Sequence, residues 1–340
     1  MLSAVAKGGA EPESSSERDD DLGQQAEMRT FTLDSKCHGL RLDKVMAQLV
    51  PDVSRSYLQQ LVQDGAVTLD GAPAGKQAAK VRAMQVLSVE LRPTEQARAF
   101  VPEPMDIDVA YEDEHFMVVR KPAGLVVHPG AGNWTGTLLN GLLGRDAVAA
   151  GLPRAGIVHR LDKDTSGLML VGRSRQGMDG LTAAIAERRV KRQYLALALG
   201  VWRGMSVLEV DEPIGRDSRN RLRMAVIPPE STYGKPARTT ISRLDSNEMA
   251  SLVACQLHTG RTHQIRVHMA HIGLPLVGDA LYGGAVRWGM RRQALHAVRL
   301  ALVHPVTGES MCFDWEPPGD FVHAVQEAGL HYNGVNMLES

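Results

Sequence analysis

The sequence has few cysteines and no long apolar run. Its 340 residues include three cysteines, Cys37, Cys255 and Cys312, which are far apart and form no CxxC pair. An odd number of widely spaced cysteines predicts reduced thiols, so we expect a cytoplasmic protein without a disulfide framework. No hydrophobic stretch approaches the roughly 20 residues that a membrane-spanning helix needs, so we expect no membrane partner.

The sequence also has almost no net charge, with 38 basic and 39 acidic residues and a formal charge of −1. This balance hides two different segments. Residues 1–27 carry two basic and seven acidic residues, whereas residues 28–93 carry nine basic and six acidic. We therefore expect a disordered acidic tail over residues 1–27 that masks a mildly basic body. The total charge neither supports nor excludes a nucleic-acid partner.

Residues 28–93 are expected to form a small α-helical hairpin domain that also contains strands. Apolar residues between positions 42 and 49 keep helical spacing, and Ser54 is a candidate N-cap for a second helix that ends at Asp64. Strand-like segments follow at 66–71 and 85–93. Residues 94–105 contain two prolines and few core residues, which predicts a linker.

Residues 106–330 are expected to form one larger domain, followed by a C-terminal tail over 331–340. Short β-type segments dominate this domain, and the clearest helical stretches lie near 135–143 and 176–189. The predicted strands are IDVAY, FMVVR, GLVVH, GIVHR, GLMLVG, QYLALALG and SLVACQL. Because strands and helices do not alternate strictly, the pattern favours an α+β fold with a mixed, largely antiparallel central sheet.

The densest group of polar side chains lies in HRLDKDTSG at 159–167, between two apolar segments. A loop between strands positions side chains accurately, which favours a functional site. The alternative is ordinary turn chemistry, since Asp and Gly are typical of hairpin turns.

Four stretches carry a family resemblance. The segment 159–167 resembles the HRLDxxTSG signature of the RluA-type pseudouridine synthases. RKPAGLVVHP at 120–129 resembles the NKPxGLxVHP segment of that family, with Arg120 in place of the usual Asn. KRQY at 191–194 and TGRTHQIRVH at 259–268 resemble two further motifs. The resemblance implies the pseudouridine synthase fold.

The resemblance also implies a reaction and its residues. Pseudouridine formation breaks the N1–C1′ bond of uridine, rotates the uracil and joins C5 to C1′, so no cofactor is expected. Asp162 is implied as the catalytic carboxylate. Burial alone disfavours an ionised carboxyl, and Arg266 is implied as its charged partner. Tyr194 is implied to stack on the flipped uracil and to take part in proton transfer.

An RNA partner is expected to contact several further residues. The target base lies inside folded RNA, so the enzyme extrudes it, and the resemblance implies that Arg160 occupies or braces the vacated space. His159 is a further expected RNA contact. Residues 39–92 resemble the S4 RNA-binding domain. In this domain three basic residues near helix starts are expected to bind phosphate: Arg41, Lys44 and Arg55.

An arginine-rich run farther along the chain matches no motif and is either a phosphate-binding element or a solvated loop. Its members are Arg216, Arg219, Arg221 and Arg223, of which Arg219 and Arg221 are our candidate RNA contacts.

Within the family, three phrases most resemble the D-type large-subunit enzymes: VHPGAGN at 127–133, PRAGIVHRLDKDTSGLM at 153–169 and HMAHIGLPLVGDALYGG at 268–284. This resemblance implies uridines of the helix 69 stem-loop in 23S rRNA as substrate, with the large ribosomal subunit or its precursor as partner. A monomeric protein is expected. Uridines elsewhere in rRNA or tRNA are the alternative.

Three other functions compete with this interpretation. Four histidines between positions 258 and 271 suggest a metal, but no carboxylate or cysteine joins them at zinc-like spacing, so none is expected. Asp162 and Asp164 could form the carboxylate pair of a glycosidase-like hydrolase. A non-catalytic RNA-binding assembly factor is the third alternative, although loss of the motif carboxylate would be typical of such a protein.

Overall fold

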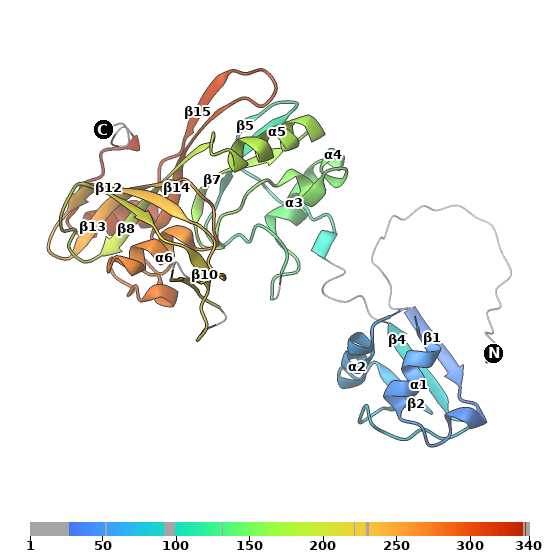
Figure 1. Ribbon diagram of the computed structural model, residues 1–340. Helices are drawn as coiled ribbons and strands as arrows, with labels where there is room; N and C mark the ends of the chain where they lie inside the picture. The colour runs from blue at the N-terminus through green and yellow to red at the C-terminus, as the bar shows by residue number, and fades with distance from the viewer. Residues whose placement is uncertain are drawn as a thin grey trace. The chain divides into compact units, whose positions relative to one another are not determined.

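The computed structural model describes residues 27–51, 53–91, 99–130, 132–220, 222–228, 231–335 and 337. They form two compact units that divide between Arg98 and Ala99 (Figure 1). The predicted acidic tail, apart from Glu27, and residues 94–98 of the predicted linker lie outside the described residues. No helix in the described part of the chain combines the length and apolar character needed to cross a bilayer.

The first unit places two helices on a small sheet with strand order β1-β4-β2-β3. Its elements are β1 (Glu27–Thr32), η1 (Ser35–Cys37), α1 (Leu42–Leu49), α2 (Arg55–Gln63), β2 (Val67–Leu69), β3 (Ala72–Pro73) and β4 (Val86–Leu91). Ser54 begins α2, because its Oγ accepts the Tyr57 N–H at 3.3 Å. Both predicted helices and the strands near 66–71 and 85–93 are present, whereas β1 was not predicted.

The second unit is built on a nine-stranded sheet with the order β5-β6-β7-β14-β8-β13-β12-β9, and β15 pairs with β14. The β7–β14 pair is parallel and the other pairs are antiparallel, which confirms the predicted mixed sheet. The strands are β5 (Val109–Glu112), β6 (Phe116–Lys121), β7 (Ser166–Gly172), β8 (Lys191–Leu199), β9 (Val207–Asp211), β12 (Arg238–Ser246), β13 (Ala250–Leu257), β14 (Leu295–Val303) and β15 (Ser310–Asp314).

Helices and one small hairpin complete the second unit. They are α3 (Leu138–Arg145), α4 (Ala147–Ala150), η3 (Pro153–Gly156), α5 (Arg175–Ala186), the hairpin β10 (Ile214–Arg216) and β11 (Met224–Val226), α6 (Gln264–His271), η4 (Ala280–Tyr282) and α7 (Gly319–Glu327). The helices predicted near 135–143 and 176–189 therefore correspond to α3 and α5.

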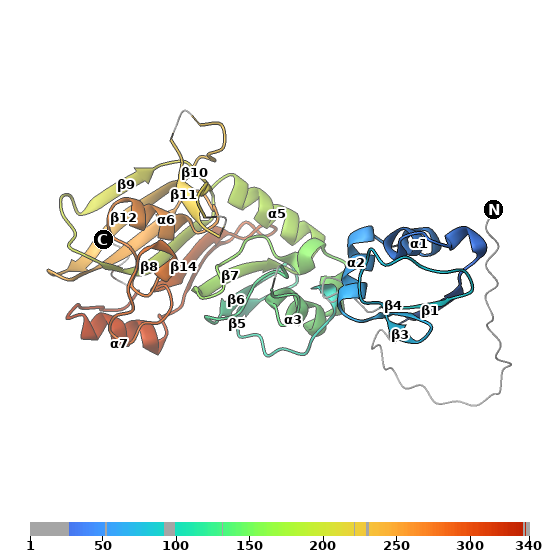
Figure 2. The same ribbon diagram turned by 90° about the horizontal axis from the view of Figure 1, so that it is seen from below.

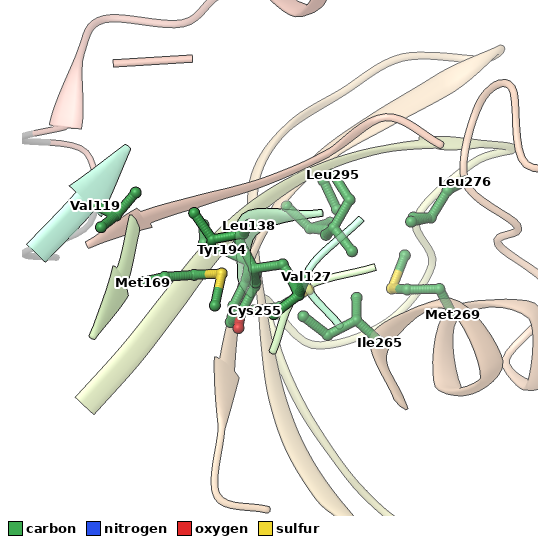
Figure 3. Packing of buried hydrophobic residues seen from close by; sticks show 14 of the residues in the cluster. Val119, Val127, Leu138, Met169, Tyr194, Cys255, Ile265, Met269, Leu276 and Leu295 are labelled. Atoms are coloured by element: carbon green, nitrogen blue, oxygen red, sulfur yellow. The ribbon is translucent and has the colours of Figure 1, made fainter. Parts of the chain in front are cut away.

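The central strand β8 separates two apolar cores. Tyr194 and Ala196 face a core that includes Ile265 of α6 and Leu138 of α3 (Figure 3). Their neighbours, including Leu195, face the other side and pack with α7. Figure 2 accordingly has α6 and α7 on opposite sides of this part of the sheet. The alternation typical of a strand thus directs Tyr194 to the α6 side.

Two predicted strands are wrong. Residues 124–128 and 156–160 form turns, a short η3 segment and loop instead, although Val127 and Ile157 are buried as their apolar character suggests. Tertiary hydrogen bonds replace the ladder in these segments, since the Gly124 N–H donates to the Lys163 carbonyl at 2.9 Å. Apolar content alone does not distinguish a buried loop from a buried strand.

Two segments at the edges of the second unit contact it. Asn140 of α3 donates from Nδ2 to the Val101 carbonyl at 2.9 Å, so the described end of the predicted linker lies on α3. Near the C-terminus, the Tyr332 hydroxyl donates to Glu316 Oε2 at 2.6 Å. Part of the predicted C-terminal tail is therefore packed, while residues 336 and 338–340 lie outside the described residues.

Candidate active site

Asp162 lies in the loop that precedes β7, and a buried lysine fixes the backbone of that loop. Lys121, the last residue of β6, is completely buried. Its Nζ donates to three backbone carbonyls at 2.8–2.9 Å, those of Pro122, Leu125 and Lys163. Burial lowers the pKa of Lys121 to about 7, against the opposing charges of Asp164 and Asp162. Three carbonyl acceptors match the three protons of an ammonium group.

The other end of the loop is tied to β14 and the segment before it. The Ser166 hydroxyl donates to Nδ1 of His296 at 2.9 Å, because Nε2 of the same ring donates to the Trp315 carbonyl at 2.8 Å. Burial lowers the pKa of His296 to about 4, so this ring is neutral at pH 7. Arg292 donates from Nη1 to the Asp164 carbonyl at 3.0 Å. The Asp162 loop is therefore anchored at both ends.

Gly167 permits the close approach of β14 to this loop. Its φ is +136°, and a Cβ on Gly167 would lie 2.4 Å from the backbone nitrogen of Ala297. A larger residue would push β14 away from β7, because the two strands are in direct parallel register at this point. Glycine at the end of the motif therefore has a packing reason.

Arg266 projects from α6 and joins two carboxylates. Its Nη1 donates to Oδ2 of Asp162 at 3.0 Å, and its Nε and Nη2 donate to the two oxygens of Asp279 at 2.7 and 2.8 Å. Burial opposes the charge of Arg266. The hydrogen bonds that Arg266 donates to Asp279 and the charge of Asp162 nevertheless raise the pKa of Arg266 above its usual value. The guanidinium thus holds the Asp162 carboxylate in one orientation.

Tyr282 and His263 complete the support around this ion pair. The Tyr282 ring lies 4.9 Å from the Arg266 guanidinium, and its hydroxyl accepts the Met224 N–H at 2.9 Å. The same hydroxyl forms a hydrogen bond of 2.7 Å with His263 Nδ1, which leaves Nε2 on the other side of the ring. This nitrogen faces Asp162 Oδ1 at 3.9 Å. Burial lowers the pKa of His263.

Tyr194 extends from β8 toward the same space and is 5% exposed. Burial raises the pKa of its phenol, an effect that the Arg192 charge opposes and the Asp162 charge reinforces. The phenol is therefore protonated at neutral pH and can present both a ring face and an O–H group.

Asp162 and Tyr194 line one open cavity of about 810 Å³. Arginines also line it: Arg154, Arg160, Arg188, Arg192 and Arg261. The carboxylate, the aromatic ring and these cations fit a substrate that combines a planar group with negative charge. The structure therefore brings together Asp162, Tyr194 and Arg160, with Arg266 directly behind Asp162.

His159 and Arg160 have different surroundings. Arg160 is exposed at the cavity and forms no hydrogen bond or ion pair with the described residues. His159 accepts the Leu170 N–H on Nε2 at 2.8 Å. Burial and the nearby charge of Arg192 lower the pKa of His159 to about 3. The neutral His159 ring therefore fixes the backbone of β7, while Arg160 remains free to contact a ligand.

The basic residues predicted in the first unit meet at one hollow of about 360 Å³, which Arg41, Lys44 and Arg55 line together. Arg41 is paired there with Asp43 at 2.7 Å, an interaction that raises the pKa of Arg41. Lys44 and Arg55 are exposed. This unit thus presents basic side chains on one surface formed by its two helices.

The arginine-rich run lies on and between β10 and β11. Arg219 is exposed in the turn, and Arg221 lies outside the described residues. Arg223 contacts the Tyr282 ring at 5.4 Å and lies 3.7 Å from Asp217. One member of the run is therefore part of the support around Arg266.

Four supporting residues were not predicted: Lys121, His263, Asp279 and Tyr282. All four lie within or beside the motifs quoted above, so the signal was present. Their roles depend on contacts that join distant segments, such as the pairing of Asp279 with Arg266, and local sequence does not reveal these contacts.

The histidines between 258 and 271 make separate hydrogen bonds. His258 Nε2 contacts the Thr240 hydroxyl at 2.8 Å and His268 Nδ1 contacts the Thr239 hydroxyl at 2.9 Å. Among the residues that the structure describes, no three His, Cys, Asp or Glu side chains converge as metal ligands would.

Known families match both units of the chain. Residues 115–271 match the family described as RNA pseudouridylate synthase, and residues 40–87 match the S4 domain. These segments contain Asp162, Tyr194 and Arg266 in one case and Arg41, Lys44 and Arg55 in the other.

Individual proteins are similar over most of their length. Ribosomal large subunit pseudouridine synthase D of Neisseria meningitidis serogroup B is 44% identical, over 88% of this chain and 83% of its own. The protein of the same name from Nitrosomonas europaea is 42% identical, over 93% and 92%. The solved structure of human RNA pseudouridylate synthase domain containing 4 aligns with a TM-score of 0.54 and 25% identity, over 66% of this chain and 94% of that one.

Proposed function

Because this chain belongs to the RNA pseudouridylate synthase family, we propose that it converts uridines of the helix 69 stem-loop in 23S rRNA to pseudouridine. Relatives named for the large ribosomal subunit, which align over most of both chains, support rRNA as the substrate. The observation that carries the chemistry is the Asp162–Arg266–Asp279 arrangement beside an 810 Å³ cavity.

Asp162 acts on the reacting nucleoside in this proposal. Arg266 donates a hydrogen bond to the carboxylate and fixes its orientation, so that little reorganisation is needed when the N1–C1′ bond breaks. The uracil then turns within the cavity, C5 joins C1′, the C5 proton leaves the ring and N1 takes up a proton. The product is an isomer of uridine, so the proposal includes neither a cofactor nor a metal.

In this proposal Tyr194 contacts the extruded base, and Arg160 fills the space that the base leaves. The ring of Tyr194 stacks on the extruded uracil, and its hydroxyl is available for proton transfer at the base or sugar. Arg160, exposed two residues before Asp162, enters the space that the uracil leaves in the RNA. The basic surface of the first unit, with Lys44 and Arg55, binds the backbone of the same RNA. The protein acts as a monomer in the cytoplasm.

The experiment that tests this proposal maps pseudouridines in vitro. Purified protein is incubated with 23S rRNA and with an isolated helix 69 stem-loop, and each modified position is identified. Pseudouridine in helix 69 is the expected result. Modification at other uridines would retain the reaction and contradict the target, and no modification of rRNA or tRNA by folded protein would contradict the function.

A further inference from the structure

Arg192 is a buried cation that has no hydrogen-bond or ion-pair partner among the described residues. It lies on β8, is 5% exposed and lines the cavity that contains Asp162. Its Nε is completely shielded from solvent and forms no hydrogen bond. The guanidinium makes neither a hydrogen bond nor an ion pair with any residue that the structure describes.

An unpaired buried guanidinium is unfavourable. Arginine cannot release its proton to escape the cost of burial, and buried charges in proteins are normally paired. Arg266, which lies behind Asp162, satisfies this rule through Asp162 and Asp279. Arg192 does not, so its partner is expected to come from a ligand that enters the cavity.

The position of Arg192 restricts that ligand. Arg192 and Tyr194 are two residues apart on one strand and both line the cavity, so their Cα atoms are separated by roughly 6.6 Å. Gly260, in the segment after β13, also lies close to the guanidinium, since a Cβ on Gly260 would lie 3.0 Å from Arg192 Nη1. A ligand that reaches Arg192 therefore lies next to the tyrosine that is proposed to stack on uracil.

We propose that Arg192 binds the RNA phosphate next to the target uridine while Tyr194 stacks on the base. This assignment rests on the proposed function. Phosphate is the anionic group of RNA, and a guanidinium fork binds it with two parallel hydrogen bonds. A uracil carbonyl is neutral and would leave the buried charge uncompensated. Arg192 is thus a substrate-positioning residue that fixes the sugar of the flipped nucleotide over Asp162.

The test removes the two charges separately and together. The RNA is a helix 69 stem-loop that carries a methylphosphonate, which is uncharged, at either the 5′ or the 3′ phosphate of the target uridine. Binding is measured with the Asp162→Asn protein, in which no turnover occurs, and with Asp162→Asn combined with Arg192→Gln. The native stem-loop is the reference RNA.

Either single change is expected to weaken binding by about 10- to 100-fold, for one of the two phosphate positions. With both changes the loss should be no larger than with one, because each removes the same contact. Independent, multiplying losses at both positions would overturn the proposal, as would unchanged binding of Arg192→Gln.

Controls separate this assignment from its alternatives. Arg175→Gln removes an exposed arginine that pairs with Asp179 outside the cavity, and native affinity is expected. Arg192→Lys keeps the charge and should recover part of the affinity. If Arg192→Gln does not fold, the Lys variant with the two methylphosphonate RNAs still tests the assignment, because a lysine that binds the phosphate should remain sensitive to one of them. Wild-type turnover of the native stem-loop reports separately on the proposed function.

Discussion

The charged residues at and behind the cavity fall into two groups, one with ion pairs inside the protein and one without. In the Asp162 wall, which consists of Asp162 at the cavity with Arg266 and Asp279 behind it, every charge has a partner at 3.0 Å or less. In the arginine rim, formed by Arg154, Arg160, Arg188 and Arg192, no ion pair occurs among the residues that the structure describes. The Asp162 wall is therefore organised by the protein alone, and in our proposal the charge of the rim is balanced by RNA.

The comparison predicts that the largest effect on turnover comes from the Asp162 wall. Asp162→Asn keeps the shape of the side chain and removes its charge, so pseudouridine formation should fall by about four orders of magnitude or more while RNA binding is retained. A single-turnover assay and an equilibrium binding measurement check both parts.

Asp164→Asn is the matched control for this change. The Asp164 carboxylate forms no hydrogen bond with the described residues, so most of the activity should remain. An equal loss in both variants would contradict a single catalytic carboxylate and would favour the paired-carboxylate hydrolase.

Asp279→Asn should give the next largest effect, on stability. It leaves Arg266 buried with one remaining carboxylate, and breaking a buried pair costs about 3–5 kcal/mol. Denaturant unfolding of the second unit measures the loss. Asp320→Asn breaks the pair with Arg292 at a carboxylate that is 47% exposed, and a cost below about 1 kcal/mol is expected there. Similar losses in the two variants would contradict the comparison.

A fall in pH should weaken the contact between His296 and Ser166 that anchors the Asp162 loop, while the arginines of the rim keep their charge. His296 has a pKa of about 4 in the folded protein against an ordinary value near 6.5. The unfolded chain therefore binds a proton first as pH falls, and stability is lost between about pH 6.5 and 4. This group contributes a slope of up to about 1.4 kcal/mol per pH unit.

Unfolding experiments between pH 7 and 4 check this window. The slope should be shallower in His296→Gln, whereas His323→Gln, which removes an exposed histidine, should leave it unchanged. An identical slope in wild type and His296→Gln would mean that this histidine does not contribute to the acid sensitivity.

The smallest effect is expected in the rim. Arg160→Gln should lower turnover by about tenfold, because part of the cost of extruding the base is no longer offset. A stem-loop in which the target uridine is already unpaired should recover most of the loss. Arg175→Gln provides the reference, and a loss that is equal for paired and unpaired targets would contradict the role of Arg160.

The sequence predicted the parts of this molecule that local rules determine. The helices α1 and α2 follow from their apolar spacing and the Ser54 cap, and the alternating side chains of β7 and β8 follow from runs of apolar residues. Residues 124–128 were predicted as a strand because their apolar content resembles a strand pattern, yet their backbone groups bond to the Asp162 loop and to the first residues of α3. The mixed sheet was predicted as a class, but not the order of its strands.

The sequence predicted which residues belong to the candidate site, but not the hydrogen bonds and ion pairs that join them. Asp162, Tyr194 and Arg266 were selected through motif resemblance, and the structure places Asp162 and Tyr194 at one cavity with Arg266 behind Asp162. The roles of Lys121 and Asp279 required three-dimensional contacts, because Lys121 binds the Lys163 carbonyl of another loop and Asp279 pairs with Arg266 of α6, and no local pattern predicts either contact. The lack of a partner for Arg192 among the described residues likewise depends on its three-dimensional surroundings and could not be predicted from the sequence.

The anchoring of the Asp162 loop to β14 has a consequence for biosynthesis. The last strand of the first unit, β4, ends at Leu91, whereas the loop at 162–166 depends on Arg266, Arg292 and His296. A ribosome makes the chain from its N-terminus, so the RNA-binding surface of the first unit emerges long before the residues that assemble the active site. The loop that carries Asp162 therefore gains all of these contacts only after His296 has left the ribosome.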